Sequence, residues 1–224
     1  MKSLLSNIKI ALNEKLYLKD PQSSSLGKRI TEQSILLIDR IGFENFTFKK
    51  LGSAIGSNES SIYRYFENKH KLLLYLTCWY WGWLEYKLVF ATNSISDPLE
   101  KTKAAIAIIT ETVKEDSDFS HINETVLSKI MVAEFSKSYL TKEVDKENKE
   151  GYYTIYKRIV NRLSEMFLQV NPSYRYAKSL ASTVLEGALH QHYLTEHFVS
   201  ITDCNKTVTP TVFFNHLVLT ALKT

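Results

Sequence analysis

We expect an all-α protein, built as a small N-terminal domain of three helices followed by a larger helical bundle. Only 7 Gly and 4 Pro occur in 224 residues, so few points break the chain. Hydrophobic residues make up 44% of the sequence, which is enough for a packed core. Apolar residues recur three and four positions apart over long stretches, which is the spacing of helices that pack on one face.

Residues 1–26 are expected to form an N-terminal arm and a linker. The segment 20–25 reads DPQSSS, a composition typical of a connecting loop. The arm before it carries apolar residues at Leu4, Leu5, Ile8, Ile10, Leu12, Leu16 and Leu18. We therefore expect it to pack on the body of the protein or on a second copy. An amphipathic segment lying on a membrane surface is the less favoured alternative, because its polar face is only weakly basic.

Residues 27–71 predict a helix-turn-helix domain. Phe48, Leu51 and Ile55 fall on one face of a short helix, and Gly52 leaves room for a second helix to cross closely. Gly56 stands where that helix must stop and the chain must turn, which needs the backbone freedom of glycine.

The second short helix follows at once. Asn58 or Ser57 can cap it, and Ile62 and Phe66 bury its inner face. The outward, polar positions are then Ser60, Ser61, Arg64 and Tyr65. A helix in this arrangement enters the major groove of DNA, while hydroxyls, backbone amides and lysines around it meet the phosphates.

Two short amphipathic helices can also meet at a glycine without binding DNA. The charge distribution favours the DNA-binding interpretation. Residues 1–71 contain 12 Lys and Arg against 7 Asp and Glu, whereas the rest of the chain contains 16 against 17. The excess of positive charge therefore lies in the part that carries the motif, although an asymmetry of this size also arises by chance.

The run from Arg29 to about Leu76 resembles the DNA-binding domain of TetR-family transcriptional repressors. It contains ITEQSILLIDRIGFENF, then TFKKLG, the turn IGS, the segment SIYRYF and the pair NK at the start of a long helix. The resemblance implies that Thr47, Tyr63 and Lys69 contact phosphates. The full set of candidate DNA contacts is Thr47, Lys49, Asn58, Glu59, Ser60, Ser61, Tyr63, Arg64, Tyr65 and Lys69.

Two residues depart from the family pattern. Ser57 stands where a buried valine is usual, and Glu59 where a lysine or a small residue is common. A carboxylate near the start of a recognition helix repels phosphate, but it can accept a hydrogen bond from cytosine or stabilise the helix N-terminus. We favour the stabilising role, because it requires no particular operator sequence.

Residues 72–224 are expected to form the helical regulatory and dimerisation domain. Periodicity and breaks predict a long helix from Lys69 to about Ala91, followed by helices from 98 to about 114 and from 124 to 138. A polar break at 115–118 separates these two. Further helices are expected from the charged stretch 142–150 through Phe167, from 173 to 198 and from 210 to 222.

An aromatic stripe runs along the long helix and includes Trp79, Trp83 and Tyr86. Such a stripe is usually core, but part of it can line a ligand cavity between helices. We expect a small apolar or aromatic ligand to sit against these three residues, with Phe135, Tyr153 and Phe167 as the opposite walls. A ligand there could tilt the recognition helix directly, because the long helix leaves the DNA-binding domain without a hinge.

The last two helices resemble the pair through which TetR-family proteins dimerise. Val184, Ala188 and Gln191 share one stripe, and Leu217 lies on the apolar last helix; these four are the predicted interface residues. Gly187 is small enough to permit close helix approach. A homodimer also suits a palindromic operator with two half-sites.

Catalysis and metal binding rank behind DNA binding. Glu186, His190, His192, Glu196 and His197 cluster on one helix, but no catalytic motif, phosphate loop or metal-ligand spacing accompanies them. We expect no enzyme activity, no cofactor and no metal. Cys78 and Cys204 are expected to be reduced thiols, and no secretion signal or membrane span is evident, which indicates a cytoplasmic protein.

The sequence thus predicts a DNA-binding transcriptional regulator, a repressor, that binds its operator as a dimer and is released by a small ligand. A DNA-binding regulator that answers to a partner protein, or to no ligand, is the first alternative. A helical enzyme or metal-binding protein is the distant one.

Overall fold

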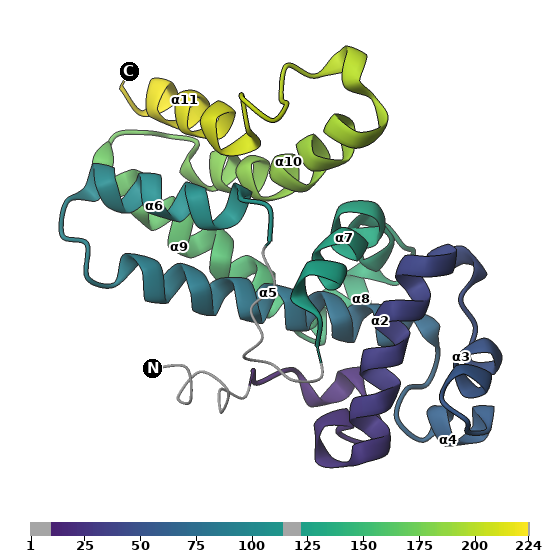
Figure 1. Cartoon of the computed structure of the whole chain (residues 1–224). Helices are drawn as coiled ribbons and strands as arrows, with labels where there is room; N and C mark the ends of the chain where they lie inside the picture. The colour runs from purple at the N-terminus through teal and green to yellow at the C-terminus, as the bar shows by residue number, and fades with distance from the viewer. Residues whose placement is uncertain (1–9, 114–121, 224) are drawn as a thin grey trace. The chain divides into compact units, whose positions relative to one another are not determined.

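The computed structural model describes residues 10–113 and 122–223, and every regular element in these ranges is a helix (Figure 1). The expected all-α class is confirmed. The α-helices are α2 (Ser25–Asn45), α3 (Phe48–Ala54), α4 (Glu59–Tyr63), α5 (Lys69–Thr92), α6 (Pro98–Thr110), α7 (Glu124–Glu134), α8 (Val144–Lys149), α9 (Thr154–Val170), α10 (Ala177–His197) and α11 (Pro210–Leu222). Short 3-10 turns are η1 (Glu14–Leu16), η2 (Pro21–Ser23), η3 (Phe135–Ser138) and η4 (Val199–Ile201). The polar break expected at 115–118 lies outside the described residues.

The chain divides into two compact units that alternate along the sequence. The first unit contains residues 1–82 and 113–153, and the second contains 83–112 and 154–224. The boundary expected between 71 and 72 therefore falls inside the first unit, and helix α5 runs from the first unit into the second.

The first unit is organised around aromatic packing between α2, α3, α4 and the start of α5. Phe46 and Phe66 are fully buried, and the ring of Phe46 meets that of Phe48 edge-on at 6.3 Å. The N-terminal arm joins this core where it is described: Leu16 is buried with Leu74 and other residues of the unit. The expectation that the arm packs on the body of the protein thus holds for this residue.

The end of α2 is held from two sides. Gly42 takes a left-handed conformation (φ 73°), which breaks the helix and frees the N–H of Phe43. That N–H donates to the buried carboxylate of Glu134 at 3.1 Å. The ammonium of Lys69 donates to the carbonyl oxygens of Phe43, Glu44 and Phe46 at 3.1–3.4 Å. These bonds satisfy backbone groups that a helix end otherwise leaves without partners.

The second unit is a layered helical bundle in which α6, α9, α10 and α11 lie side by side (Figure 1). Its core includes Ile106, Ile159, Leu185 and Val218, all almost completely buried. Gly187 meets the ring of Phe214 so closely that a Cβ atom would lie 2.8 Å from it. Close approach at Gly187 is therefore confirmed, between α10 and α11 of one chain.

Two of the four predicted interface residues are wrong. Val184 is fully buried and Ala188 is 1% exposed in the single chain, so neither side chain can reach a second copy. An apolar stripe marks burial, but it does not reveal whether the covering surface belongs to the same chain. Gln191 and Leu217 are half-buried and keep an accessible surface.

A carboxylate paired with two guanidinium groups joins α5 to α9 within the second unit. Arg158 and Arg162 donate to Glu85 at 2.6 and 2.8 Å through their Nε atoms. Burial alone would raise the pKa of Glu85, but the two guanidinium groups outweigh it and hold this pKa below its ordinary value. Charge pairing therefore keeps Glu85 ionised at a buried position.

Candidate nucleic-acid interface

The turn between α3 and α4 is as tight as the sequence predicts. A Cβ atom on Gly52 would lie 2.8 Å from the carbonyl oxygen of Ser57, so only glycine allows the two segments to cross at this distance. Gly56 adopts φ 61°, in the left-handed region that favours glycine. Asn58 caps α4, because its side-chain oxygen accepts hydrogen bonds from both the backbone N–H and the hydroxyl of Ser61. The sequence therefore fixes the geometry of this turn locally.

Most of the candidate DNA contacts lie on the surface of α3 and α4, which sit side by side in Figure 1. The exposed ones are Thr47, Lys49, Asn58, Ser60, Tyr63 and Arg64, while Glu59 and Ser61 are half-buried. Thr47 caps α3 by accepting the N–H of Lys50 at 3.2 Å. The structure thus brings eight of the ten candidates to the accessible surface of two adjacent helices.

Tyr63 is oriented by packing. Its ring meets the ring of Phe48 edge-on at 5.0 Å, while 47% of the side chain remains exposed. A ring held in this way has little freedom to rotate. Its hydroxyl can therefore approach a phosphate without a large loss of side-chain entropy.

Tyr65 is not an outward residue, and the expectation that it contacts DNA is wrong. It is only 3% exposed, and its hydroxyl forms a 2.7 Å hydrogen bond with the hydroxyl of Ser24. The reason is that α4 ends at Tyr63, so residues 64–66 leave the helical spacing from which an outward position follows. No pattern in the sequence indicates the contact with Ser24.

Lys69 lies half-buried at the start of α5. An ammonium group has three N–H donors, and three carbonyl oxygens at the end of α2 surround this one. Its aliphatic stem also places the ammonium 4.8 Å from the centre of the Phe43 ring. In this structure Lys69 caps α2, and the phosphate contact implied by the family resemblance stays a prediction.

The six predicted pocket residues are divided between the two units. Trp79, Phe135 and Tyr153 belong to the first unit, and Trp83, Tyr86 and Phe167 to the second. Trp79, Trp83 and Phe167 are almost completely buried, and Phe135 is 9% exposed. The hydroxyl of Tyr153 lies 2.7 Å from a carboxylate oxygen of Glu147 and 3.1 Å from the carbonyl oxygen of Ser138. Their role as ligand contacts stays a prediction.

A pocket of about 770 Å³ lies in the second unit, and none of those six residues lines it. The end of α6, the end of α10 and the loop before α11 form its walls. Among the lining residues, His192 contacts the carbonyl of Thr110 at 2.9 Å, and the hydroxyl of Thr110 bonds that of Thr211. Cys204, a buried free thiol, also lines it. The sequence reasoning did not identify this pocket, since its lining comes from three separate segments.

Side chains of the acidic and histidine cluster on α10 form hydrogen bonds and ring contacts with neighbouring residues. Glu186 accepts a hydrogen bond from the hydroxyl of Tyr156, and the ring of His197 packs on that of Tyr193 at 4.5 Å. In the ranges 10–113 and 122–223, no three His, Cys, Asp or Glu side chains are placed so that they could hold a metal ion. Nor is any helix in these ranges long and apolar enough to cross a membrane.

An exposed polar helix that follows a glycine turn, in an all-helical chain, is the arrangement found in helix-turn-helix DNA-binding domains. Residues 30–76 match the family model for bacterial regulatory proteins of the tetR family. The chain therefore carries a TetR-family N-terminal domain, and its fold is that of TetR-family regulators. No curated protein matches the sequence.

Three solved structures illustrate the likeness. AibR in complex with isovaleryl coenzyme A and operator DNA is 19% identical, with 84% of this chain and 94% of AibR covered and a TM-score of 0.54. The fatty acid degradation regulator FadR from Bacillus halodurans is 16% identical, with coverage of 87% and 93% and a TM-score of 0.55. A tetR-family regulatory protein from Rhodococcus RHA1 is 11% identical, with coverage of 90% and 97% and a TM-score of 0.59. At these identities the likeness concerns the fold.

Proposed function

We propose that this chain is a repressor that binds a palindromic operator as a homodimer and releases it when a small ligand binds. The observation that carries the proposal is the exposed polar surface of α4. This helix follows a turn so tight that only glycine can occupy position 52. Arg64 lies exposed at the end of this helix, where a guanidinium can donate two hydrogen bonds to the major-groove edge of a guanine.

Apolar surface on the last helices supports the homodimer. Phe213 and Val212 on α11 are 38% and 53% exposed, and Phe198 just after α10 is 51% exposed. Side chains of this kind lie at the centre of protein interfaces more often than on the open surface. With Val184 and Ala188 assigned to the core, we propose that Phe213, Leu217 and Gln191 belong to the dimer contact.

Control by a small ligand is supported by the fold of the similar structures. AibR was solved with isovaleryl coenzyme A, and FadR is described as a regulator of fatty acid degradation. A ligand with an acyl or other apolar portion suits the aromatic side chains Trp83 and Tyr86, which α5 contributes to the second unit. To release DNA, the ligand must bind the DNA-incompetent form more tightly, because equal affinity for both forms shifts no equilibrium.

The DNA-binding part of the proposal is tested by selecting duplexes from a random-sequence pool with the whole chain. We expect enrichment of an inverted repeat. Arg64→Ala should weaken binding to that repeat by about 1–3 kcal/mol and relax the preference at one position in each half-site. Arg40→Ala is the matched control, since Arg40 is also an exposed arginine and lies on α2 of the same unit. If the pool yields no enriched sequence, the chain does not act as a sequence-specific DNA reader.

A further inference from the structure

The N-terminal arm crosses the end of the candidate recognition helix. The backbone N–H of Leu18 donates to the carbonyl oxygen of Tyr65 at 2.8 Å. Six residues along the arm, the hydroxyl of Ser24 bonds the Tyr65 hydroxyl at 2.7 Å. Two independent hydrogen bonds therefore fix the segment from 18 to 24 against Tyr65, which directly follows Arg64 in the chain.

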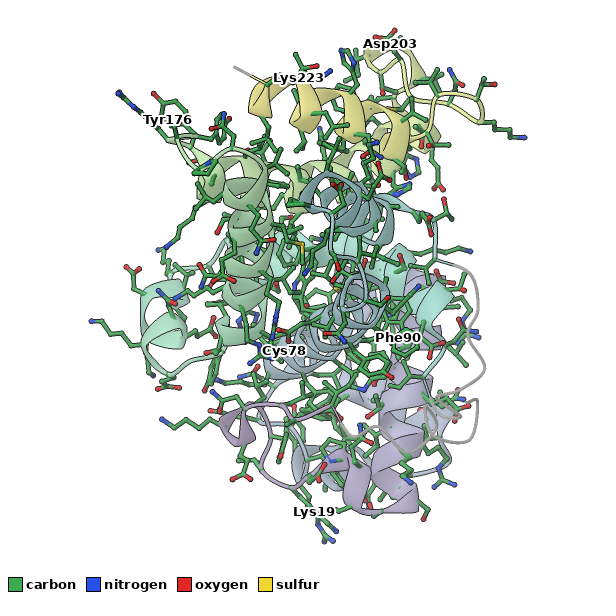
Figure 2. The ribbon with its side chains drawn as sticks, turned by 90° about the vertical axis from the view of Figure 1, so that its left-hand side faces the viewer. Lys19, Cys78, Phe90, Tyr176, Asp203 and Lys223 are labelled. Atoms are coloured by element: carbon green, nitrogen blue, oxygen red, sulfur yellow. The ribbon has the colours of Figure 1, made fainter. Side chains whose placement is uncertain are left out.

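Lys19 stands at the centre of this crossing. Its ammonium lies 5.2 Å from the centre of the Tyr65 ring, so the side chain extends along the end of α4. Lys19 is exposed, and Figure 2 shows its side chain projecting from the surface of the first unit. No ion pair involves Lys19 within the residues that the structure describes, and the neighbouring Asp20 uses a carboxylate oxygen to accept the N–H of Gln22.

Three other lysines near the helix-turn-helix are engaged. Lys69 and Lys50 both donate to backbone carbonyls of the 43–46 segment, and Lys137 pairs with Glu44. Among the described residues, the ring of Tyr65 is the partner recorded for the Lys19 ammonium. This positive charge lies next to the segment that contains Arg64, the C-cap residue of α4. An unneutralised lysine in this position lowers the electrostatic energy of a nearby polyanion.

We propose that Lys19 is a DNA-phosphate contact, which adds the N-terminal arm to the DNA interface. This inference rests on the proposed operator binding. The structure favours a phosphate over a base in the minor groove, because Leu16 is buried in the core and Leu18 is tied to Tyr65. With its backbone held at both residues, the segment from Leu16 to Leu18 cannot extend into a groove. The exposed side chain of Lys19 can still reach DNA.

The arm also has a second effect on binding. Tyr65, which lies just after the end of the candidate recognition helix, holds the arm in place. The backbone at Lys19 is therefore positioned before DNA arrives, and little backbone entropy is lost when the side chain meets a phosphate. A flexible arm with the same lysine would contribute less at equal charge.

The test compares Lys19→Ala, Lys19→Arg and the control Lys129→Ala in the whole chain. Lys129 is exposed on α7 of the same unit and outside the helix-turn-helix. Fluorescence anisotropy would measure the affinity for a mixed-sequence duplex and for the selected operator at several NaCl concentrations. We expect Lys19→Ala to lower the slope of log K against log salt by about 0.9 for each bound copy of the chain, equally on both duplexes. Lys19→Arg and Lys129→Ala should keep the wild-type slope.

Each other result overturns the inference. An unchanged slope for Lys19→Ala, with wild-type protein that binds the operator, shows that Lys19 meets no phosphate. A loss on the operator but not on the mixed-sequence duplex shows a base contact instead. Wild-type protein that binds neither duplex refutes the proposed function itself, so the two failures are distinguishable.

Discussion

Replacing Gly52 with alanine should damage the helix-turn-helix, whereas the same change at Gly187 should not. At both positions a Cβ atom would come within 2.8 Å of its nearest neighbour. The neighbours differ in kind. At Gly52 they are the carbonyl oxygen of Ser57 and, at 3.3 Å, the backbone nitrogen of Glu59, while at Gly187 they are atoms of the Phe214 ring.

The size of the effect follows from what can move. Alanine is about 0.8–1.0 kcal/mol better than glycine inside a helix, and both positions receive this gain. Forcing one carbon into a space bounded by backbone costs about 1–3 kcal/mol, because the chain itself must shift. A ring at the far end of a side chain can give way at small cost. Gly52→Ala should therefore lose about 1 kcal/mol of unfolding free energy, and Gly187→Ala should be neutral or gain up to about 1 kcal/mol.

Urea unfolding of both variants measures the stability difference, and binding to the selected operator measures the functional one. Gly52→Ala should also weaken operator binding beyond its loss of folded protein, because the displaced backbone from Ser57 to Glu59 leads directly into α4. Gly187→Ala should bind as wild type. If both substitutions change stability with the same sign and leave operator affinity intact, the close crossing at Gly52 does not set the position of α4.

Two further predictions concern the second unit. Glu85 has a lower pKa in the folded chain than in the unfolded one, so the stability it contributes is present above the unfolded value of about 4.3 and is lost as pH falls through the folded value. Glu85→Gln should therefore lower the free energy of unfolding by about 1–2 kcal/mol at neutral pH. Urea unfolding at acidic pH should show a smaller difference in stability between the variant and the wild type. Phe213→Glu should give a folded monomer with weakened operator binding in sedimentation and anisotropy measurements, whereas Val184→Glu should unfold the chain in circular dichroism, because it buries a charge; a stable dimer for Phe213→Glu would exclude this part of α11 from the interface.

The sequence predicts the helices well, because their ends carry strong local signals. Asn58 and Thr209 cap α4 and α11, and Pro98 and Pro210 occupy the first position of α6 and α11. These signals act within a few residues of each other, so they can be read without knowledge of the fold.

The errors arise where a contact joins distant parts of the chain. Helical spacing predicts Tyr65 on the surface, yet the helix stops two residues earlier and the hydroxyl of Ser24, 41 residues away in sequence, hydrogen-bonds the Tyr65 hydroxyl. Val184 belongs to an apolar stripe that is equally compatible with a core and with an interface. The hydrogen bond from the N–H of Phe43 to the carboxylate of Glu134 joins residues 91 positions apart, and no periodic pattern in the sequence predicts it.

Because the two units alternate along the sequence, they limit where the chain can be truncated without disrupting a unit. The chain passes between the units after residues 82, 112 and 153. A truncated chain that ends near residue 71 would keep the helix-turn-helix but lose Glu134, which satisfies the broken end of α2, and Tyr152, which covers Leu16. The helix-turn-helix therefore cannot be cut out as an independently folding domain. During synthesis, the first unit can complete its fold only after residues up to about 153 have left the ribosome.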